Sequence, residues 1–186
     1  MIRTFIAVNL AAPVIEEIAK VRSALQEAKG EIRWTRVEGL HLTLKFLGDI
    51  ERNQVEPILA ALRETTRARL PLHILAQGLG AFPHLRRPRV LWVGLSGEGL
   101  QEMSEAIETA LVPLDFPPEE REFTPHLTLG RVRSLRGWEH VLARVKEYEH
   151  TRFGESLVDQ VTLYQSELRP DGAVYTALGS AALRPA

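Results

Sequence analysis

The sequence contains no cysteine in its 186 residues, which excludes disulfide bonds, thiolate catalysis and zinc sites built from cysteine. It also lacks a basic excess, since 23 Lys and Arg residues stand against 24 Asp and Glu residues, for a net charge of −1. A protein that coats long nucleic acids usually carries such an excess. Any contact with nucleic acid is therefore expected to be small and local.

Long apolar runs are missing as well. No stretch approaches the ~18 consecutive apolar residues of a membrane span, and the first residues, MIRTF, do not resemble a signal peptide. We therefore expect a cytoplasmic protein without membrane contact. Hydrophobic residues still make up 45% of the chain, which is enough for a core in one domain or in two small lobes.

The spacing of apolar residues predicts alternating strands and helices. Strands are predicted near residues 4–10, 32–46, 72–79, 89–95, 123–132, 157–168 and 173–178, with a turn at 170–172. Helices are predicted after Pro13 and around residues 55–62, 100–111 and 138–148. This mixture favours an α+β fold with a mostly antiparallel sheet, in which two lobes share a cleft.

One tetrapeptide, His-Leu-Thr-Leu, occurs twice, at residues 41–44 and 126–129. Successive side chains of a strand point to opposite faces. The histidine and the threonine of each copy should therefore share one face, and the two leucines the other. In the first copy, the same alternation places Lys45 with His41 and packs Phe46 with the leucines.

Two histidines on one polar surface suit the hydrolysis of a cyclic phosphodiester. The reaction needs a base to activate water and an acid to protonate the leaving oxygen, and histidine serves either role because its pKa lies near neutral pH. The hydroxyls of Thr43 and Thr128 can donate to phosphate oxygens. The repeat alone leaves open which of His41 and His126 is the acid.

Two alternative interpretations stay open. The histidines could bind a metal ion, or they could be structural residues whose repeated motif arose by chance. A catalytic zinc ion usually has three protein ligands, and the sequence contains no His-Glu-x-x-His pattern. We therefore expect a site that uses neither a metal nor a cofactor.

The two motifs and their surroundings resemble the two-histidine (2H) phosphoesterase family. They are most similar to its branch of bacterial and archaeal RNA 2′,3′-cyclic phosphodiesterases, also described as 2′-5′ RNA ligases. The resemblance extends over nearly the whole chain: residues 3–8 are similar to the first strand of the family, 34–48 to the first motif, 82–94 to the middle hairpin and 123–131 to the second motif.

This resemblance implies an α+β fold of two pseudo-symmetric lobes, each with a mostly antiparallel sheet flanked by helices, and an active-site groove between them. Residues 1–186 would form this single bilobal domain, with one motif per lobe. The resemblance also implies hydrolysis of terminal 2′,3′-cyclic phosphate to a 2′-phosphomonoester without metal, with O3′ as the leaving group. The implied partners are RNA ends with a cyclic phosphate, including tRNA halves joined reversibly through a 2′-5′ linkage, and the protein is expected to be a monomer.

The same resemblance assigns roles to the residues of the two motifs. His41 is implied as the general acid that protonates O3′, and His126 as the general base that activates water. Thr43, Thr128 and Arg131 are implied as phosphate-binding residues, with Arg131 making a charge-assisted contact.

Several other residues are weaker candidates for RNA contact. Arg86, Arg87 and Arg89 form a basic hairpin tip that either clamps an RNA backbone or is simply solvated. Trp34 and Phe46 could stack on a base, although the alternation in the first motif favours core packing for Phe46.

Three further functions stay open: a 3′–5′ RNA exonuclease of the same superfamily, a ligase of tRNA halves, and a non-catalytic nucleotide-binding module. The presence of both histidines and both threonines disfavours the last, because binding alone needs no acid–base pair. Tyr164 and Tyr175 fall on late strands, where they either line the groove or, as we expect, pack at the edge of the core.

Overall fold

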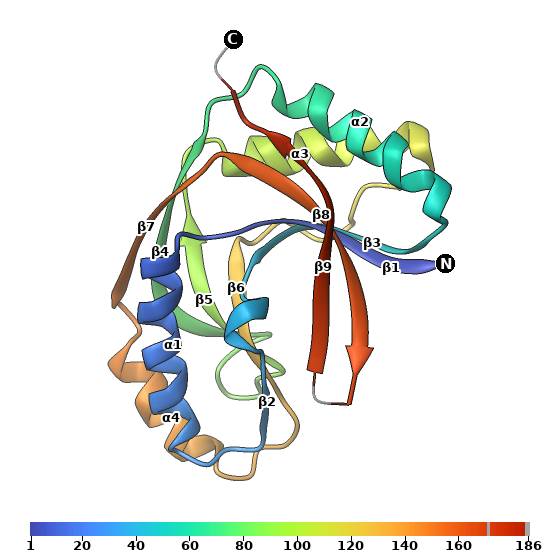
Figure 1. Cartoon of the computed structure of the whole chain (residues 1–186). Helices are drawn as coiled ribbons and strands as arrows, with labels where there is room; N and C mark the ends of the chain where they lie inside the picture. The colour runs from blue at the N-terminus through green and yellow to red at the C-terminus, as the bar shows by residue number, and fades with distance from the viewer. Residues whose placement is uncertain (171, 185–186) are drawn as a thin grey trace.

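The computed structural model describes residues 1–170 and 172–184. Its elements alternate along the chain as the apolar spacing predicts, and they form one α+β fold (Figure 1). The helices are α1 (Ala12–Gln26), α2 (Val55–Thr66), α3 (Leu100–Leu111) and α4 (Trp138–Glu147), and a short 3₁₀ helix, η1 (Val37–Gly39), precedes the first motif. The strands are β1 (Ile2–Val8), β2 (Ile32–Trp34), β3 (Leu42–Ile50), β4 (Leu72–Phe82), β5 (Val90–Ser96), β6 (His126–Val132), β7 (Arg152–Val158), β8 (Gln160–Arg169) and β9 (Gly172–Ala182).

The helices form where apolar residues recur at helical spacing. In α1, Val14, Ile18 and Leu25 are buried, and a proline occupies the first turn, where the missing N–H has no helical partner to lose. In α2, Ile58 and Leu62 are fully buried. Burying each of these large aliphatic side chains contributes about 1.5–3 kcal/mol, so one apolar face holds each helix on the sheet.

All the strands belong to one nine-stranded antiparallel sheet, with the order β7-β4-β5-β6-β3-β1-β8-β9 and β2 paired with β6 outside this path. We call β3-β1-β8-β9 the first lobe and β7-β4-β5-β6, with β2, the second lobe. The lobes meet at a single residue pair between β3 and β6, Leu42 with Leu127. The expected bilobal fold is confirmed, but the two lobes share one curled sheet through this pair.

The two lobes have the same plan, and their helices are exchanged. Helix α1 follows β1 of the first lobe but packs on α4 and β7 of the second lobe. Helix α3 follows β5 of the second lobe but packs on α2 and β3 of the first (Figure 1). Each lobe therefore carries two helices, one from each half of the chain.

The first motif strand contains a β-bulge at its second leucine. Along β1, Ile6 pairs with Lys45 and the next residue, Ala7, pairs with Thr43, so Leu44 has no partner. An extra residue of this kind reverses the alternation of side chains beyond it. The strand therefore changes face between Thr43 and Lys45.

The second motif strand has the same irregularity at the equivalent position. Along β5, Leu91 pairs with Gly130 and Trp92 pairs with Thr128, which leaves Leu129 without a partner. Leu44 and Leu129 are the last residues of the two copies of the tetrapeptide, so each bulge occupies the same place in its motif. The repeat in sequence is thus a repeat in backbone geometry.

The prediction that Lys45 shares the face of His41 is wrong because of the first bulge. Lys45 points to the opposite side of the sheet and is 3% exposed. Its Nζ forms an ion pair with Glu108 of α3 and donates to the carbonyl of Pro117 at 2.8 Å. The buried ammonium therefore joins the motif strand to the helix that covers it.

The prediction that Phe46 packs with the leucines is wrong for the same reason. Beyond the bulge its side chain returns to the face that carries His41. It is 60% exposed, and its ring lies 6.3 Å from the ring of Phe5.

The strand predicted over residues 157–168 is in fact two strands. β7 ends at Val158 at the edge of the second lobe, and β8 begins at Gln160 and pairs with β1 and β9 in the first lobe. Asp159 is therefore one of the points where the chain crosses between lobes, and the polar residues Asp159 and Gln160 interrupt the apolar residues there. The turn predicted at 170–172 joins β8 and β9, but Asp171 lies outside the described residues.

Candidate active site

The Leu42–Leu127 pair brings the two motifs together at the centre of the sheet. Both leucines are fully buried, so their neighbours in sequence leave the sheet on the opposite face. Because the two strands are antiparallel, the register places Thr43 on the side of His126 and His41 on the side of Thr128. We call this surface, which carries both His-Thr pairs, the histidine face.

His41 is held at both ring nitrogens. Its Nδ1 lies 2.7 Å from the carbonyl oxygen of Gly39, and because a carbonyl only accepts, Nδ1 is the donor. Its Nε2 lies 3.0 Å from Oγ1 of Thr43, so in the neutral ring Nε2 accepts from the threonine hydroxyl. Nε2 is therefore the nitrogen available for proton transfer.

Aromatic rings surround His41 and lower its pKa. The Phe5 ring stacks on the imidazole at 4.7 Å, and Tyr175 meets it edge-on at 5.1 Å. Tyr164 stacks on the other side of Phe5 at 5.4 Å. Burial lowers the pKa of His41 below 6.5, and the hydrogen bond to the Gly39 carbonyl opposes this effect only in part. The free protein thus favours a neutral His41.

The His126 ring makes the same kind of hydrogen bond to the backbone as the His41 ring, but it is more exposed to solvent. Its Nδ1 donates to the carbonyl of Thr124, two residues earlier in the chain, at 2.6 Å. The Nδ1 of His41 donates in the same way to the carbonyl of Gly39, also two residues earlier. One ring, that of Phe82, contacts the His126 imidazole edge-on at 4.8 Å. Again Nε2 is left for chemistry.

Arg131 reaches the histidine face because of the second bulge. Without the extra residue, strand alternation would turn its side chain to the helix side. Burial raises the pKa of the Tyr175 phenol, while the charges of Arg131 and Arg3 act in the opposite direction. The guanidinium of Arg131, from the second motif, therefore lies near the tyrosine that contacts His41 of the first.

The aromatic residues of this site were the part that sequence reasoning missed. Phe5, Phe82 and Trp92 were not proposed as site residues, and Tyr175 was expected at the edge of the core. Trp92 pairs with Thr128 and its ring lies 5.2 Å from that of Phe82. A residue opposite a motif threonine shares its face, but a single sequence does not show which residues are opposite.

Four of the weaker candidates for RNA contact, all among the described residues, do not touch the motif histidines. The Trp34 ring faces the Arg22 guanidinium, 5.9 Å from its centroid, and packs against the core. Arg86, Arg87 and Arg89 are exposed in the loop between β4 and β5. In the described residues no hydrogen bond or ring contact joins these four residues to either motif histidine, and their RNA contacts stay predictions.

Within residues 1–170 and 172–184, no group of three His, Asp or Glu side chains gathers in a way that could hold a metal ion. Over the same residues, no helix has the length and apolar content that a membrane crossing requires.

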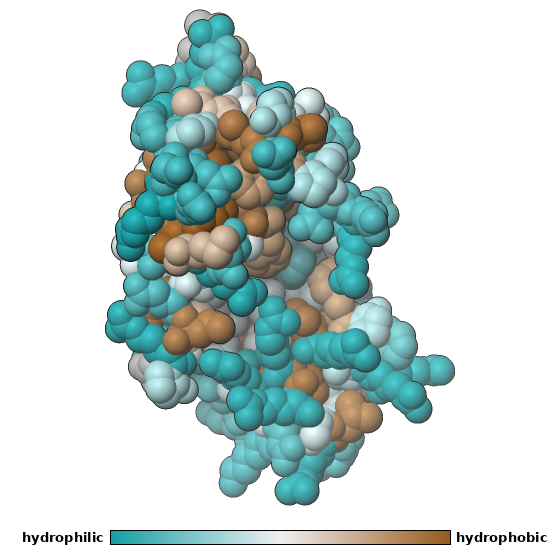
Figure 2. All heavy atoms as spheres, turned by 90° about the vertical axis from the view of Figure 1, so that its right-hand side faces the viewer, coloured by the Kyte–Doolittle hydropathy of each residue, from teal (hydrophilic) through white to brown (hydrophobic). Residues whose placement is uncertain are grey.

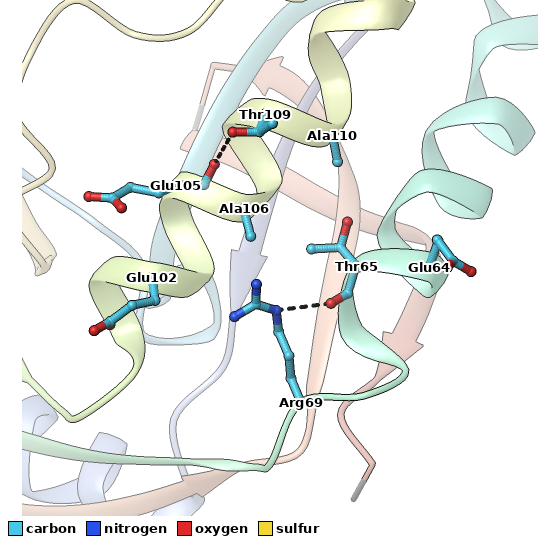
Figure 3. A pocket seen from close by; sticks show the side chains of 8 residues that line it. All are labelled: Glu64, Thr65, Arg69, Glu102, Glu105, Ala106, Thr109 and Ala110. Carbon is cyan, nitrogen blue, oxygen red and sulfur yellow. Dashed lines mark hydrogen bonds between the residues drawn. The ribbon is translucent and has the colours of Figure 1, made fainter. Parts of the chain in front are cut away.

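A hollow of about 550 Å³ between α2 and α3 is separate from the histidine face (Figure 3). One of its polar groups is satisfied locally, since Arg69 Nε donates to the carbonyl of Thr65 at 3.0 Å. None of the predicted site residues contributes to it. Its lining consists of Glu64, Thr65, Arg69, Glu102, Glu105, Ala106, Thr109 and Ala110.

The two halves of the chain match one family model in succession. Residues 8–92 and residues 93–175 each match the LigT-like phosphoesterase model. The second match follows the first by the same interval that separates the two histidines, so each motif falls at the same place in its match. The chain belongs to the LigT-like phosphoesterase family.

Relatives of known name point to one activity within that family. A Methanothermobacter thermautotrophicus protein named RNA 2′,3′-cyclic phosphodiesterase is 32% identical over 176 residues, covering 94% of this chain and 95% of the relative. A protein of the same name from Archaeoglobus fulgidus is 34% identical over 177 residues, covering 95% and 97%. The similarity therefore extends over nearly the whole length of each protein.

Solved structures confirm the fold. A crystal structure of a Thermus thermophilus protein superposes with a TM-score of 0.75 at 29% identity, covering 98% of both chains. Escherichia coli LigT complexed with 3′-AMP superposes with a TM-score of 0.76 at 25% identity, also covering 98% of both chains.

Proposed function

We propose that this chain is an RNA 2′,3′-cyclic phosphodiesterase that opens a terminal cyclic phosphate to a 2′-phosphomonoester. The observation that carries this proposal is the Leu42–Leu127 pair, which sets two His-Thr pairs on one face. The relatives named RNA 2′,3′-cyclic phosphodiesterase support the substrate class. E. coli LigT, whose complexes include 3′-AMP, ATP and phosphate, supports a phosphate-binding surface.

The proposed reaction needs one proton transfer at each histidine. His126 Nε2 takes a proton from water as the water oxygen attacks phosphorus. The bond between phosphorus and O3′ breaks, and His41 Nε2–H gives its proton to O3′. The products are a 2′-phosphomonoester and a 3′-hydroxyl, and solvent exchange returns both rings to their starting protonation states.

The phosphate contacts follow from the same face. In the free protein the Thr43 hydroxyl donates to His41 Nε2. Once that nitrogen carries its own proton, the hydroxyl can turn to a phosphate oxygen. Thr128 supplies the equivalent hydroxyl from the other motif. Arg131 adds a charge-assisted contact that strengthens as negative charge develops on the phosphate oxygens.

The assignment of acid and base rests on the family resemblance. As the acid, His41 must be protonated when it acts, yet burial lowers its pKa in the free protein. A phosphate anion bound beside the ring favours the charged form and raises that pKa again. Substrate binding would therefore prepare His41 for its role.

Ligation is a secondary activity of the same geometry. If the 5′-hydroxyl of a second RNA takes the place of water, attack on phosphorus with loss of O3′ forms a 2′-5′ linkage, and the reverse step cleaves it. We propose tRNA halves as candidate partners. We further propose that the chain acts as one bilobal domain, in the cytoplasm and as a monomer.

Product analysis tests the proposed function. A dinucleotide ending in 2′,3′-cyclic phosphate should give the 2′-phosphate product with wild-type protein. A 3′-phosphate product would reverse the leaving group. Progressive shortening of a longer RNA would instead indicate a 3′–5′ exonuclease, and tight binding without turnover would indicate a nucleotide-binding module.

A further inference from the structure

We infer that Arg33 binds a second phosphate of the RNA, the phosphodiester that precedes the terminal nucleotide, beside the Arg131 contact to the reacting phosphate. This inference rests on the proposed function and specifies its substrate: an RNA end rather than a free cyclic nucleotide. It starts from the pairing of β2 with β6.

Arg33 and Arg131 are direct partners across these two antiparallel strands. Directly paired residues leave a sheet on the same side, with Cβ atoms roughly 4.5–5.5 Å apart. The neighbours of Arg33, Ile32 and Trp34, pack against the hydrophobic core on the other side. Arg33 therefore stands on the histidine face next to Arg131, and both side chains are exposed.

Two like charges at directly opposed positions destabilise a sheet unless something neutralises them. Among the described residues, no carboxylate lies within 4.0 Å of Arg33 or Arg131, and Glu31, two residues before Arg33, already binds Arg136 and Ser134. Other exposed arginines with a carboxylate within reach do pair with it, namely Arg63, Arg67, Arg136, Arg144, Arg152 and Arg169. What sets Arg33 and Arg131 apart in the described part of the chain is that two unpaired guanidinium groups stand directly opposite each other.

The missing partner is best supplied by a ligand with an anionic group. A guanidinium binds a phosphate oxygen pair through two parallel N–H bonds, which a phosphodiester provides. Arg33 lies one strand farther from His126 than Arg131 does, at a spacing of about 4.8 Å between strands. An RNA chain that leaves the reacting phosphate toward β2 meets Arg33 with its next phosphate.

The surroundings suit a polar ligand. β2 lies in the lower part of the molecule in Figure 1, and hydrophilic side chains dominate the lower part of the side shown in Figure 2. An RNA that ends in a cyclic phosphate has its other phosphates only on its 5′ side. Arg33 therefore binds only a phosphate on the 5′ side of the terminal nucleotide. A cyclic mononucleotide has no such phosphate and cannot make this contact.

The test compares two dinucleotides that end in 2′,3′-cyclic phosphate, one with a normal phosphodiester between its nucleosides and one with a neutral methylphosphonate. For wild-type protein, kcat/KM should be about tenfold higher for the charged dinucleotide, which is the low end for a hydrogen-bonded charge at an exposed site. Arg33→Gln should bring the ratio close to one. Arg33→Lys should keep part of it, because the charge remains but the planar fork is lost.

Arg144→Gln is the matched control, because Arg144 is an exposed arginine on α4, away from the histidine face. It should leave the ratio unchanged. Equal rates on the two dinucleotides with wild-type protein, or a ratio unaffected by Arg33→Gln, would overturn the inference while the proposed function stands. A wild-type protein that hydrolyses neither dinucleotide nor a cyclic mononucleotide would overturn both.

Salt dependence gives an independent readout. The attraction between a guanidinium and a phosphate is screened by salt. In wild-type protein the slope of log kcat/KM against log salt should be steeper for the charged dinucleotide than for the neutral one, and in Arg33→Gln the two slopes should be nearly equal. Equal slopes in wild-type protein would contradict the contact.

Discussion

Phe46 and Arg131 occupy equivalent positions in the two lobes, each five residues after its motif histidine and each returned to the histidine face by a bulge. The bulge that precedes each residue is the same, but one side chain is an apolar ring and the other is a cation. The site is therefore symmetric in geometry and asymmetric in chemistry. In an RNA complex, Phe46 of the first lobe would contact a base and Arg131 of the second lobe would contact a phosphate.

Replacing Phe46 should weaken substrate binding without loss of stability. Its ring is 60% exposed, so little burial is lost, whereas stacking of a base on an aromatic ring is worth about 1–3 kcal/mol. We expect Phe46→Ala to raise KM for a cyclic nucleotide about tenfold or more. Leu157→Ala is a matched control, since Leu157 is 59% exposed on β7. An unchanged KM for Phe46→Ala would rule out the base contact.

Either motif histidine should be necessary for the reaction. We expect His41→Ala and His126→Ala each to reduce kcat by about 10²–10⁴-fold, the usual contribution of a general acid or base. The exposed His73, which lies outside both motifs, provides the control, and His73→Ala should keep full activity. Circular dichroism checks that each variant is folded. Substantial turnover by either motif variant would contradict the two-histidine mechanism.

The pH dependence of kcat/KM should reflect the lowered pKa of His41. Because burial lowers its pKa from the ordinary value of 6.5, the neutral ring predominates at and above that pH, and half-protonation requires a lower pH. We expect an NMR titration of the free protein to place the His41 midpoint below 6.5, and kcat/KM to be bell-shaped with one break at that midpoint. In the kcat profile the same break should lie at higher pH, since a bound phosphate favours the charged ring.

Phe5→Leu tests the cause of that shift. Phe5 is 3% exposed and stacks on His41, so the smaller side chain should admit water and bring the His41 pKa back toward 6.5. The break in kcat/KM should move by the same amount. A break that stays in place while the NMR midpoint moves would show that another group controls the rate.

The buried Lys45–Glu108 pair should contribute to stability rather than to chemistry. Lys45→Ala leaves the Glu108 carboxylate without its partner, and we expect a loss of about 3 kcal/mol in the free energy of unfolding, near the low end for a broken buried pair because Glu108 keeps some solvent contact. The double variant Lys45→Met/Glu108→Leu should recover most of this loss. Urea denaturation provides the measurement, and a double variant no more stable than Lys45→Ala would contradict the prediction.

Excess chelator should leave the rate of cyclic phosphate hydrolysis unchanged. In the proposed mechanism the two imidazoles supply both the acid and the base, so that mechanism needs no metal-bound water. The measurement is the initial rate with and without EDTA after prolonged dialysis. Activity that disappears with EDTA and returns with zinc would replace the two-histidine mechanism by a metal-dependent one.

The sequence predicted the helices, most of the strands and the two motifs sharing one polar surface because these features are local or repeated. Helical stripes and strand alternation depend on neighbouring residues, and the repeated tetrapeptide marks equivalent positions directly. The faces of Lys45 and Phe46 could not be predicted, since a bulge depends on the partner strand and has no consistent residue signature. The crossover at Asp159 was not predicted, although Asp159 and Gln160 interrupt the apolar residues there, because a single sequence does not show which strands pair with which.

The aromatic residues around His41 were missed for a different reason. Phe5 and Tyr175 lie near opposite ends of the chain and meet only because β8 joins β1 to β9. Single-sequence patterns give the face of a residue within its own strand, but they do not give the order of strands in a sheet. The proximity of Arg33 to Arg131 depends on strand order in the same way.

The exchange of helices between the lobes bears on how such a chain can arise. Because α1 packs on the second lobe and α3 on the first, neither half of the chain contains all the helices that cover its own strands. A half-length ancestor would have left apolar surface exposed as a single copy. Two copies related by a two-fold axis would have covered each other, with the equivalents of Leu42 and Leu127 on that axis. Fusion of two such copies into one gene would then preserve the joint while freeing each motif to diverge.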